Sequence, residues 1–499
     1  MRSGRDARST VGGAPALLMK TAFFPLKARA TIRSHIKSRM DYTMKQSRLS
    51  FLFARVYVAS LLAGSFFLVT AESSFALDRQ PNSDYHARRE ALARKVGGVV
   101  VLFAATENDG PNDLYGFRQD DNFYYLSGSA EPGGALLIAS AADAKGDTPA
   151  RAYTEILFLP PRNLTQEKWT GPKLGAENPE APRITGFDHV EDMGQLPNDV
   201  ARFVTGARPV LYTDVASGDE TSTSLKPLAF LKRFNAYLSF QDLKPMMSSL
   251  RTTKDAGEVT LIRKAVDASV AAHFAAFKAV KPNVNEREIS ALMQYEWGKR
   301  GCERVAYAPI VGSGYYSTVL HYSEDDNIMK SGDVVVIDAA GEYSMYAADI
   351  TRTLPINGHF TARQREIYDI VLGAQQAAIA AFQSGKSSLR RGGADSLYQV
   401  AFDYINTHGK DLHGQPLGQY FIHGLSHYIG LNVHDPNDYS VPLGPGMAFT
   451  IEPGIYIPEE NLGVRIEDDF WVDQDGKLIK LSGALPSKAE DVEKLMAGK

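Results

Sequence analysis

Cysteine is almost absent from this chain of 499 residues, in which Cys302 is the only one. A single cysteine excludes an intrachain disulfide, and we expect Cys302 to be a small buried side chain. Two catalytic motifs are also missing. No Gly-x-Ser-x-Gly nucleophile elbow occurs, and the glycine-rich phrase at residues 312–314 lacks the Lys-Ser/Thr of a phosphate-binding loop.

An excess of positive charge is missing as well. The chain has 54 Lys and Arg against 58 Asp and Glu, which gives a formal net charge of −4. No basic stripe runs through the body of the sequence, so nothing favours a nucleic-acid-binding protein. The apolar fraction of 44% and charged fraction of 22% are ordinary for a soluble globular protein, and the length predicts two to three domains.

The first 79 residues have the pattern of a leader. Residues 1–48 are basic and poor in acids, the apolar run Val56–Ala71 follows, and small residues surround Ala71 and Ala76. This order predicts a signal peptide. We expect translation of the protein to start at Met40 or Met44, which gives the leader a normal length. We expect export to the periplasm or beyond, with a retained membrane anchor or a misread buried segment as alternatives, because the run is short for a membrane span.

Residues 80–249 have an α/β pattern followed by a polar linker. We expect a helix at residues 85–95 and strands at residues 98–103, 122–128, 135–139 and 156–159. Residues 250–490 interleave helices with strand-like segments, which predicts an α+β domain. The helices are expected at residues 255–280, 285–297, 362–382 and 395–406.

Five residues of the second domain have side chains that suit a pair of divalent metals. They are Asp338, Asp349, His427, Glu452 and Glu467. Four carboxylates and one imidazole form an oxygen-rich set that suits Mn²⁺ and tolerates Co²⁺ or Zn²⁺. Two such ions about 3.5–4 Å apart can lower the pKa of a shared water and polarise a carbonyl group.

The spacing of the carboxylates fits two hairpins. A turn centred on Tyr343-Ser344 would place Asp338 directly opposite Asp349, with Cβ atoms about 5 Å apart. Two carboxylates at that distance repel each other unless a cation or a shared proton lies between them. A loop at residues 458–461 gives the same pairing of Glu452 with Glu467.

The contexts of these residues resemble those of the pita-bread metallopeptidases, which include methionine aminopeptidase, prolidase and Xaa-Pro aminopeptidase (aminopeptidase P). The resemblance spans residues 80–485 and is strongest to the aminopeptidase P subfamily. The phrases that carry it are Val311-Gly312-Ser313-Gly314, Leu320-His321-Tyr322, Asp349-Ile350-Thr351-Arg352-Thr353, residues 423–430, Val433-His434-Asp435, Thr450-Ile451-Glu452-Pro453-Gly454 and Val464-Arg465-Ile466-Glu467-Asp468.

The resemblance implies a creatinase/methionine aminopeptidase-like catalytic domain and a dinuclear-metal exopeptidase. Such an enzyme removes the first residue from peptides whose second residue is proline. Glu452 would be the general base as well as a ligand, and His321 or His434 would stabilise the oxyanion. His423 would contact the substrate in the cleft. Arg465 would bind the substrate and would also orient a metal-bound carboxylate.

Two other interpretations stay open from the sequence. A prolidase would use the same metals but cleave only Xaa-Pro dipeptides. A metal-free peptide-binding relative would have lost its ligands, whereas all five are present here. By analogy with the family, we expect a homodimer or homotetramer.

Overall fold

The computed structural model describes residues 77–107, 116–144, 150–205, 210–214 and 238–498. All described residues belong to one compact unit, Phe75–Lys499. Residues 1–76 of the expected leader, with its apolar run, and the polar linker at residues 217–224 lie outside the described residues. Within the described part, no helix is both long and apolar enough to cross a bilayer.

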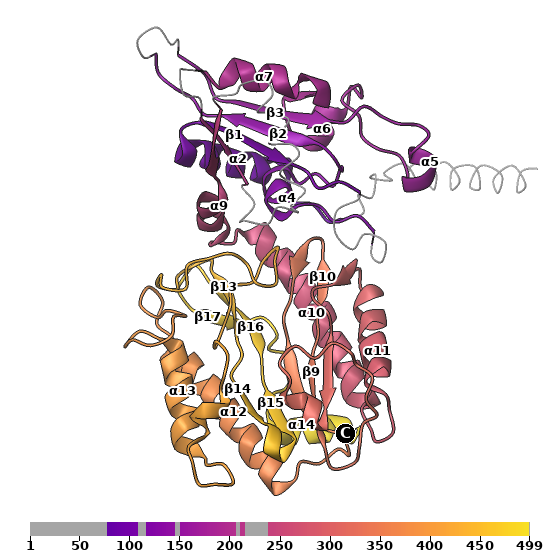
Figure 1. Ribbon diagram of the computed structural model, residues 1–499, viewed down its shortest axis with the longest axis vertical. Coiled ribbons are helices and arrows are strands. Elements are labelled where there is room, and N and C mark those ends of the chain that lie inside the picture. Colours follow the sequence, from indigo (N-terminus) through magenta and orange to yellow (C-terminus); the bar gives the residue numbers. More distant parts are fainter. Residues whose placement is uncertain (1–76, 108–115, 145–149, 206–209, 215–237, 499) are drawn as a thin grey trace, which may run out of the picture. The chain divides into compact units, whose positions relative to one another are not determined.

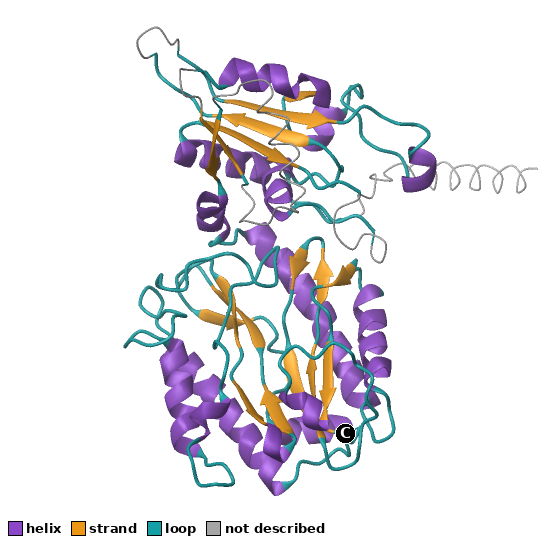
Figure 2. Ribbon diagram, in the orientation of Figure 1, coloured by secondary structure: helices purple, strands orange, loops and turns teal. Residues whose placement is uncertain are grey.

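The first domain is a sheet of six strands covered by short helices (Figures 1 and 2). The strand order is β4-β3-β2-β1-β5-β6. Strands β1, β2 and β3 pair antiparallel, and the outer neighbours pair parallel. The strands are β1 (Val99–Phe103), β2 (Ala135–Ala139), β3 (Thr154–Leu159), β4 (His189–Asp192), β5 (Val210–Thr213) and β6 (Ser239–Asp242). The helices are α2 (Asn82–Val96), α4 (Asp121–Ser127), α5 (Glu167–Thr170), α6 (Ala181–Thr185) and α7 (Leu196–Phe203).

The strand expected at residues 122–128 is wrong, because this segment is helix α4. Asp120 caps the helix by accepting a hydrogen bond from the Phe123 amide, and Gly128 ends it in the left-handed conformation with φ +60°. Capping and a glycine stop outweigh the strand preference of the aromatic run.

The second domain arranges its helices on both sides of small antiparallel sheets (Figures 1 and 2). Helix α10 packs against α11, β10 and β11, whereas α12 packs against α13, β13, β14 and β15. The helices are α10 (Ala256–Ala279), α11 (Glu286–Gly298), α12 (Ala362–Ala381), α13 (Leu397–His408) and α14 (Ala489–Met496). Helix α9 (Lys244–Arg251), which precedes them, packs against α2 of the first domain (Figure 1). The expected α+β domain is confirmed.

Four sheets of this domain carry its strands. Their orders are β11-β10-β7, β12-β9-β8, β13-β16-β17 and β14-β15. The strands are β7 (Arg304–Val305), β8 (Ile310–Ser313), β9 (Val334–Asp338), β10 (Gly341–Tyr343), β11 (Tyr346–Ala347), β12 (Thr351–Pro355), β13 (Ala448–Ile451), β14 (Gly454–Ile457), β15 (Leu462–Arg465), β16 (Asp468–Val472) and β17 (Leu478–Lys480).

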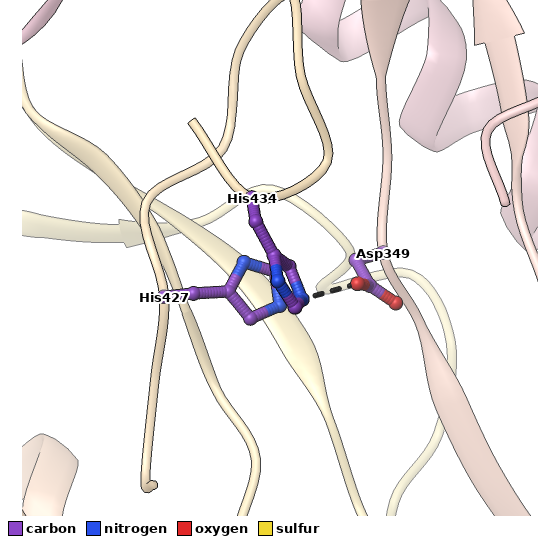
Figure 3. A group of neighbouring side chains, drawn as sticks. All are labelled: Asp349, His427 and His434. Carbon is purple, nitrogen blue, oxygen red and sulfur yellow. Dashed lines mark ion pairs between the residues drawn. The ribbon is translucent and has the colours of Figure 1, made fainter. Parts of the chain in front are cut away.

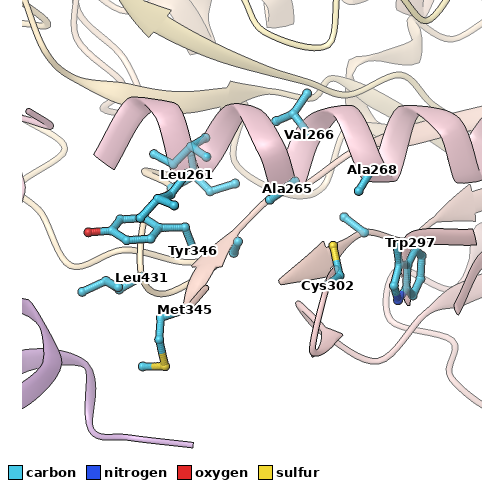
Figure 4. Packing of buried hydrophobic residues seen from close by; sticks show 14 of the residues in the cluster. Leu261, Ala265, Val266, Ala268, Trp297, Cys302, Met345, Tyr346 and Leu431 are labelled. Carbon is cyan, nitrogen blue, oxygen red and sulfur yellow. The ribbon is translucent and has the colours of Figure 1, made fainter. Parts of the chain in front are cut away.

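A continuous apolar core holds α10 against these strands. Leu261, Ala265 and Ala268 project from α10 among Tyr346 and Trp297, which are nearly inaccessible to solvent (Figure 4). Cys302 is buried in the same cluster, and burial raises the pKa of its thiol to about 12. The expectation of a small buried cysteine is therefore confirmed.

Candidate active site

One predicted hairpin register is wrong and the other is right. Asp338 pairs with Thr351, two residues beyond the expected partner Asp349. The turn is centred on Ser344 and Met345, whose φ angles of +48° and +74° fit a two-residue hairpin loop with both central residues left-handed. The second register is confirmed, because Gly454 pairs with Arg465 in the alignment that places Glu452 opposite Glu467.

The five ligand-type side chains nevertheless meet. Asp338 ends β9 and Asp349 lies in the loop before β12, while Glu452 follows β13 and Glu467 separates β15 from β16. The amide of Glu467 donates a hydrogen bond to the Thr351 carbonyl at 3.2 Å, which joins the two halves of the domain at the site. Three overlapping groups of potential ligand atoms result, each within 4.8 Å. They are Asp349, His427 and His434; His427, Glu452 and Glu467; and Asp338, Asp349 and Glu467.

His427 lies in a segment without helix or strand that runs beside β13. Its Nδ1 lies 3.1 Å from the Tyr428 carbonyl oxygen, which can accept the Nδ1–H of the neutral ring. The other nitrogen, Nε2, then faces carboxylate oxygens of Asp349 at 3.2 Å, Glu452 at 3.5 Å and Glu467 at 3.8 Å. A backbone acceptor at one nitrogen is the usual way to fix a metal-binding tautomer at the other.

The electrostatics of the site require a compensating charge. Burial and mutual repulsion raise the pKa values of Asp349 and Glu467, and burial raises the pKa of Glu452 to about 7. Burial by itself would lower the pKa of His427, but Asp349 and Glu452 outweigh it and raise the value to about 9. Among the described residues, the buried Oδ1 of Asp349 has no hydrogen-bond partner. Clustered, partly unsatisfied carboxylates of this kind fit divalent cations.

A cavity of about 650 Å³ opens above these residues. The predicted residues His321, His423, His434 and Arg465 all line it together with the five ligand-type residues. The ring of His434 lies 4.1 Å from that of His427, on the side facing Asp349 (Figure 3). Burial lowers the pKa of His434 to about 4, and the charges of His427 and His321 act in the same direction.

Arg465 and His423 belong to one hydrogen-bonded chain. The Arg465 guanidinium donates to Asp338 Oδ2 at 2.6 Å and to the Tyr456 hydroxyl at 2.8 Å. The Tyr456 oxygen lies 2.9 Å from His423 Nε2, and burial lowers the pKa of His423 to about 3. A neutral His423 is therefore connected through two side chains to the ligand-type residue Asp338.

Two further residues at the site escaped the sequence argument. The Tyr307 hydroxyl donates to Asp338 Oδ1 at 2.5 Å, and the Thr351 hydroxyl donates to Glu467 Oε2 at 2.6 Å. Thr351 lies within a phrase that resembles the family. Tyr307, in contrast, lies thirty-one residues before Asp338, and no spacing rule connects the two.

Replacing Tyr307 by Phe is expected to weaken metal binding about 10- to 100-fold, because a ligating carboxylate loses the donor that orients it. Competition with a chelator of known affinity measures this change. Tyr295→Phe, on an exposed face of α11, is the matched control and should bind metal as the unmodified protein does. Equal metal affinity in Tyr307→Phe would contradict an orienting role for the hydroxyl.

An open cavity whose floor gathers four carboxylates and an imidazole is the arrangement of a metal-dependent hydrolase. Comparisons with known proteins agree with this class. The profile of metallopeptidase family M24 matches residues 260–474, and that of the aminopeptidase P N-terminal domain matches residues 85–212. Xaa-Pro aminopeptidase of Escherichia coli K12 is 32% identical over 438 residues, which cover 83% of this chain and 97% of that protein.

Solved structures give the same result. Proline aminopeptidase P II from Yersinia pestis superposes with a TM-score of 0.72 at 30% identity, covering 84% of this chain and 100% of that one. Aminopeptidase P from Escherichia coli with the inhibitor Pro-Leu superposes with a TM-score of 0.72 at 29% identity, covering 84% and 99%. The chain belongs to metallopeptidase family M24 and carries the two-domain aminopeptidase P fold.

Proposed function

We propose that this metalloaminopeptidase releases the N-terminal residue from peptides whose second residue is proline. The observation that carries the proposal is the complete set of five ligand-type residues at the floor of an open cavity. The Escherichia coli relative is named for the same specificity. The solved structure of aminopeptidase P from Escherichia coli contains the proline-containing inhibitor Pro-Leu. Proline lacks an N–H and restricts the preceding residue, so a dedicated cleft is needed for this bond.

Asp338, Asp349, His427, Glu452 and Glu467 would hold two divalent ions, for which we propose Mn²⁺ because oxygen ligands predominate. When bound, the ions would lower the pKa of the attacking water and polarise the scissile carbonyl. Reconstitution of the metal-free protein with Mn²⁺, Co²⁺ or Zn²⁺ in parallel tests the choice. Highest activity with Zn²⁺ would contradict it.

The protein side chains handle the protons and the oxyanion. Glu452 lines the cavity beside His427 and Glu467, where it would accept the proton of the attacking water and pass it to the leaving proline nitrogen. His321 and His434 line the cavity where they can hydrogen-bond the oxyanion. The chain His423–Tyr456–Arg465 reaches from the cavity wall to Asp338 and would fix the substrate side of the site.

Hydrolysis of Arg-Pro-Pro and Ala-Pro by the purified protein, compared before and after chelation, tests the proposed specificity. We expect metal-dependent release of arginine from the tripeptide and no cleavage of N-acetyl-Arg-Pro-Pro, because the free amine is needed in the cleft. Cleavage of Ala-Pro alone would identify a prolidase instead. A folded protein that binds no metal and cleaves neither peptide would refute an enzymatic function.

We also propose that residues 1–79 direct export and that the mature enzyme is a homodimer or homotetramer. The basic stretch, apolar run and small residues of the leader support export. N-terminal sequencing of the protein from a periplasmic or secreted fraction tests it, and an uncleaved cytosolic protein would contradict it. Light scattering of the purified enzyme tests the assembly, which a monomeric mass would refute.

A further inference from the structure

Glu286, the first residue of α11, is a fully buried carboxylate outside the set of metal-ligand residues. Its Oε1 accepts hydrogen bonds from the Ser313 amide at 2.7 Å and the Ser313 hydroxyl at 2.6 Å. Its Oε2 accepts from the Tyr322 hydroxyl and the Asn327 amide, each at 2.9 Å. Four donors match the full acceptor capacity of an ionised carboxylate.

These donors enclose the segment that carries His321, called here the His321 loop and defined as residues 314–327. Ser313 ends β8 immediately before the loop, and Asn327 is its last residue. Tyr322 follows His321 directly in the chain. A single carboxylate therefore joins both ends of the loop and the residue beside His321.

Other contacts also hold the loop. Asp325 accepts a hydrogen bond from the Val311 amide at 2.9 Å, and the Gly463 amide donates to the Ser317 hydroxyl at 2.8 Å. A Cβ atom on Gly463 would lie 1.8 Å from the Ser317 carbonyl oxygen, so the loop packs directly on the backbone of β15. Within the loop, the Tyr322 hydroxyl also donates to Asp326 Oδ1 at 3.1 Å and accepts from the Asp326 amide at 3.3 Å. Among these contacts, only that of Glu286 connects the residue next to His321 to a residue outside the loop.

Burying Glu286 is costly, which points to a specific role. In the described part of the chain, no lysine or arginine forms an ion pair with it, and its charge is compensated by hydrogen bonds and by the N-terminus of α11. A buried charge without a counter-ion is destabilising relative to an apolar residue of similar size. The gain from Glu286 is the fixed position of the loop.

We infer that Glu286 is a positioning residue that holds the His321 ring at the cavity wall beside His434. The inference deepens the proposed function and rests on it, because His321 acts on the peptide only if the peptide is cleaved. His321 lines the cavity, and it lies within electrostatic range of His434, whose pKa it helps to lower. Glu286 itself does not touch the substrate.

The variant Glu286→Gln keeps the size of the side chain but replaces one carboxylate oxygen by an NH2 group. This group would face two hydrogen-bond donors of the loop instead of accepting from them. We expect kcat/KM for Arg-Pro-Pro to fall about 10- to 100-fold through misplacement of His321. The fall should appear mainly in kcat, with bound metal unchanged. An unchanged kcat/KM in a folded Glu286→Gln variant would overturn the inference.

A double-mutant cycle with His321→Ala separates positioning from a general structural role. His321→Ala is expected to lower kcat/KM about 10²- to 10³-fold, as removal of an oxyanion donor does. Adding Glu286→Gln to it should change kcat/KM by no more than about twofold, because the residue through which Glu286 acts is gone. Losses that multiply in the double variant would overturn the inference.

Two further variants guard against unfolding. Tyr322→Phe removes the hydrogen bonds of this hydroxyl with Glu286 and Asp326 and keeps the other three hydrogen bonds to Glu286. We expect a several-fold loss of kcat/KM that vanishes in the His321→Ala background. Glu258→Gln is the matched control, since Glu258 is also a buried carboxylate in the first turn of a helix but lies outside the His321 loop. It should lower the thermal unfolding temperature and leave kcat/KM unchanged. A loss of kcat/KM in Glu258→Gln equal to that in Glu286→Gln would overturn the inference.

Hydrogen exchange measured by mass spectrometry tests the loop without reference to activity. Glu286→Gln should speed exchange within residues 314–327 about 10- to 100-fold, because the loop loses hydrogen bonds to a charged group. Strands β9 and β13 should stay protected. Unaltered exchange in the loop would refute the inference even if the peptide is cleaved. Faster exchange in a protein that cleaves no peptide would refute the proposed function instead and leave Glu286 as the residue that holds this loop.

Discussion

Glu452→Gln is expected to lower kcat for Arg-Pro-Pro by about 10³-fold or more while the protein remains folded. The carboxylate has two roles, as a ligand to the metals and as the acceptor of the water's proton, and an amide can perform neither well. General-base catalysis alone contributes about 10²- to 10⁴-fold. The measurement is steady-state hydrolysis at saturating metal, so that weaker metal binding does not hide the effect on chemistry.

The matched control for this substitution is Glu459→Gln. Glu459 belongs to the hairpin loop between β14 and β15 but is exposed and lines no part of the cavity. Its variant should hydrolyse Arg-Pro-Pro at the rate of the unmodified protein. If Glu452→Gln retained more than about a tenth of the normal kcat, the proton acceptor would have to be another residue.

As the pH rises from 5 to 7.5, the unfolding temperature of the metal-free protein is expected to fall by about 3 °C or more relative to that of metal-free Glu452→Gln. Burial raises the pKa of Glu452 from 4.5 in the unfolded chain to about 7 in the folded one, and the pKa values of Asp349 and Glu467 are also raised. Between these values the folded protein binds more protons than the unfolded chain. The contribution of these carboxyl groups to stability is therefore fully present below the unfolded-state pKa and is lost as the pH rises through the folded-state pKa. The lowered pKa values of His423 and His434 act in the opposite direction, but they are common to both proteins and cancel in the difference.

Thermal unfolding followed by circular dichroism at several pH values, with and without Mn²⁺, measures this effect. Saturating Mn²⁺ should raise the unfolding temperature most at neutral pH, because the cations then replace the protons between the carboxylates. Metal-free Glu452→Gln should become more stable relative to the unmodified protein as the pH rises from 5 to 7.5, since one of the raised carboxyl groups is absent. A difference in unfolding temperature between the two metal-free proteins that stays constant from pH 5 to pH 7.5 would contradict the arrangement of charges described here.

The identities of the site residues could be predicted from the sequence because each lies in a short, distinctive phrase. The register of Glu452 with Glu467 could also be predicted, since the loop between their strands is short and local. The structure confirms the loop at Pro458–Asn461, where Asn461 takes a left-handed conformation with φ +49°. Local turn geometry is sufficient to set the pairing of such a hairpin.

The position of Asp349 depends on contacts that no local rule contains. Its backbone amide donates a hydrogen bond to Oδ2 of Asp469 at 3.0 Å, and Asp469 lies on a strand 120 residues later in the chain. The bridge between Thr351 and Glu467 is equally remote in sequence. These contacts hold Asp349 beside Asp338 although the two are not directly opposed. Hairpin counting therefore identified the right neighbours from the wrong register.

Tyr307 and Glu286 show the same limit. From its sequence context, each would be expected to serve only in packing or helix capping. Their roles arise from the folded structure, which brings Tyr307 to Asp338 and Glu286 to both ends of the His321 loop. A buried polar side chain acquires its partner through tertiary packing, and periodicity and spacing do not encode it.

The most direct test is stepwise addition of Mn²⁺ to the metal-free protein, with bound metal and Arg-Pro-Pro hydrolysis measured on the same samples. Elemental analysis after removal of free metal gives the number of ions per chain. The five ligand-type residues predict that two ions are retained and that hydrolysis appears as they bind. Full hydrolysis without metal, or a folded protein that retains none, would contradict the assignment of this cavity as a metallopeptidase active site.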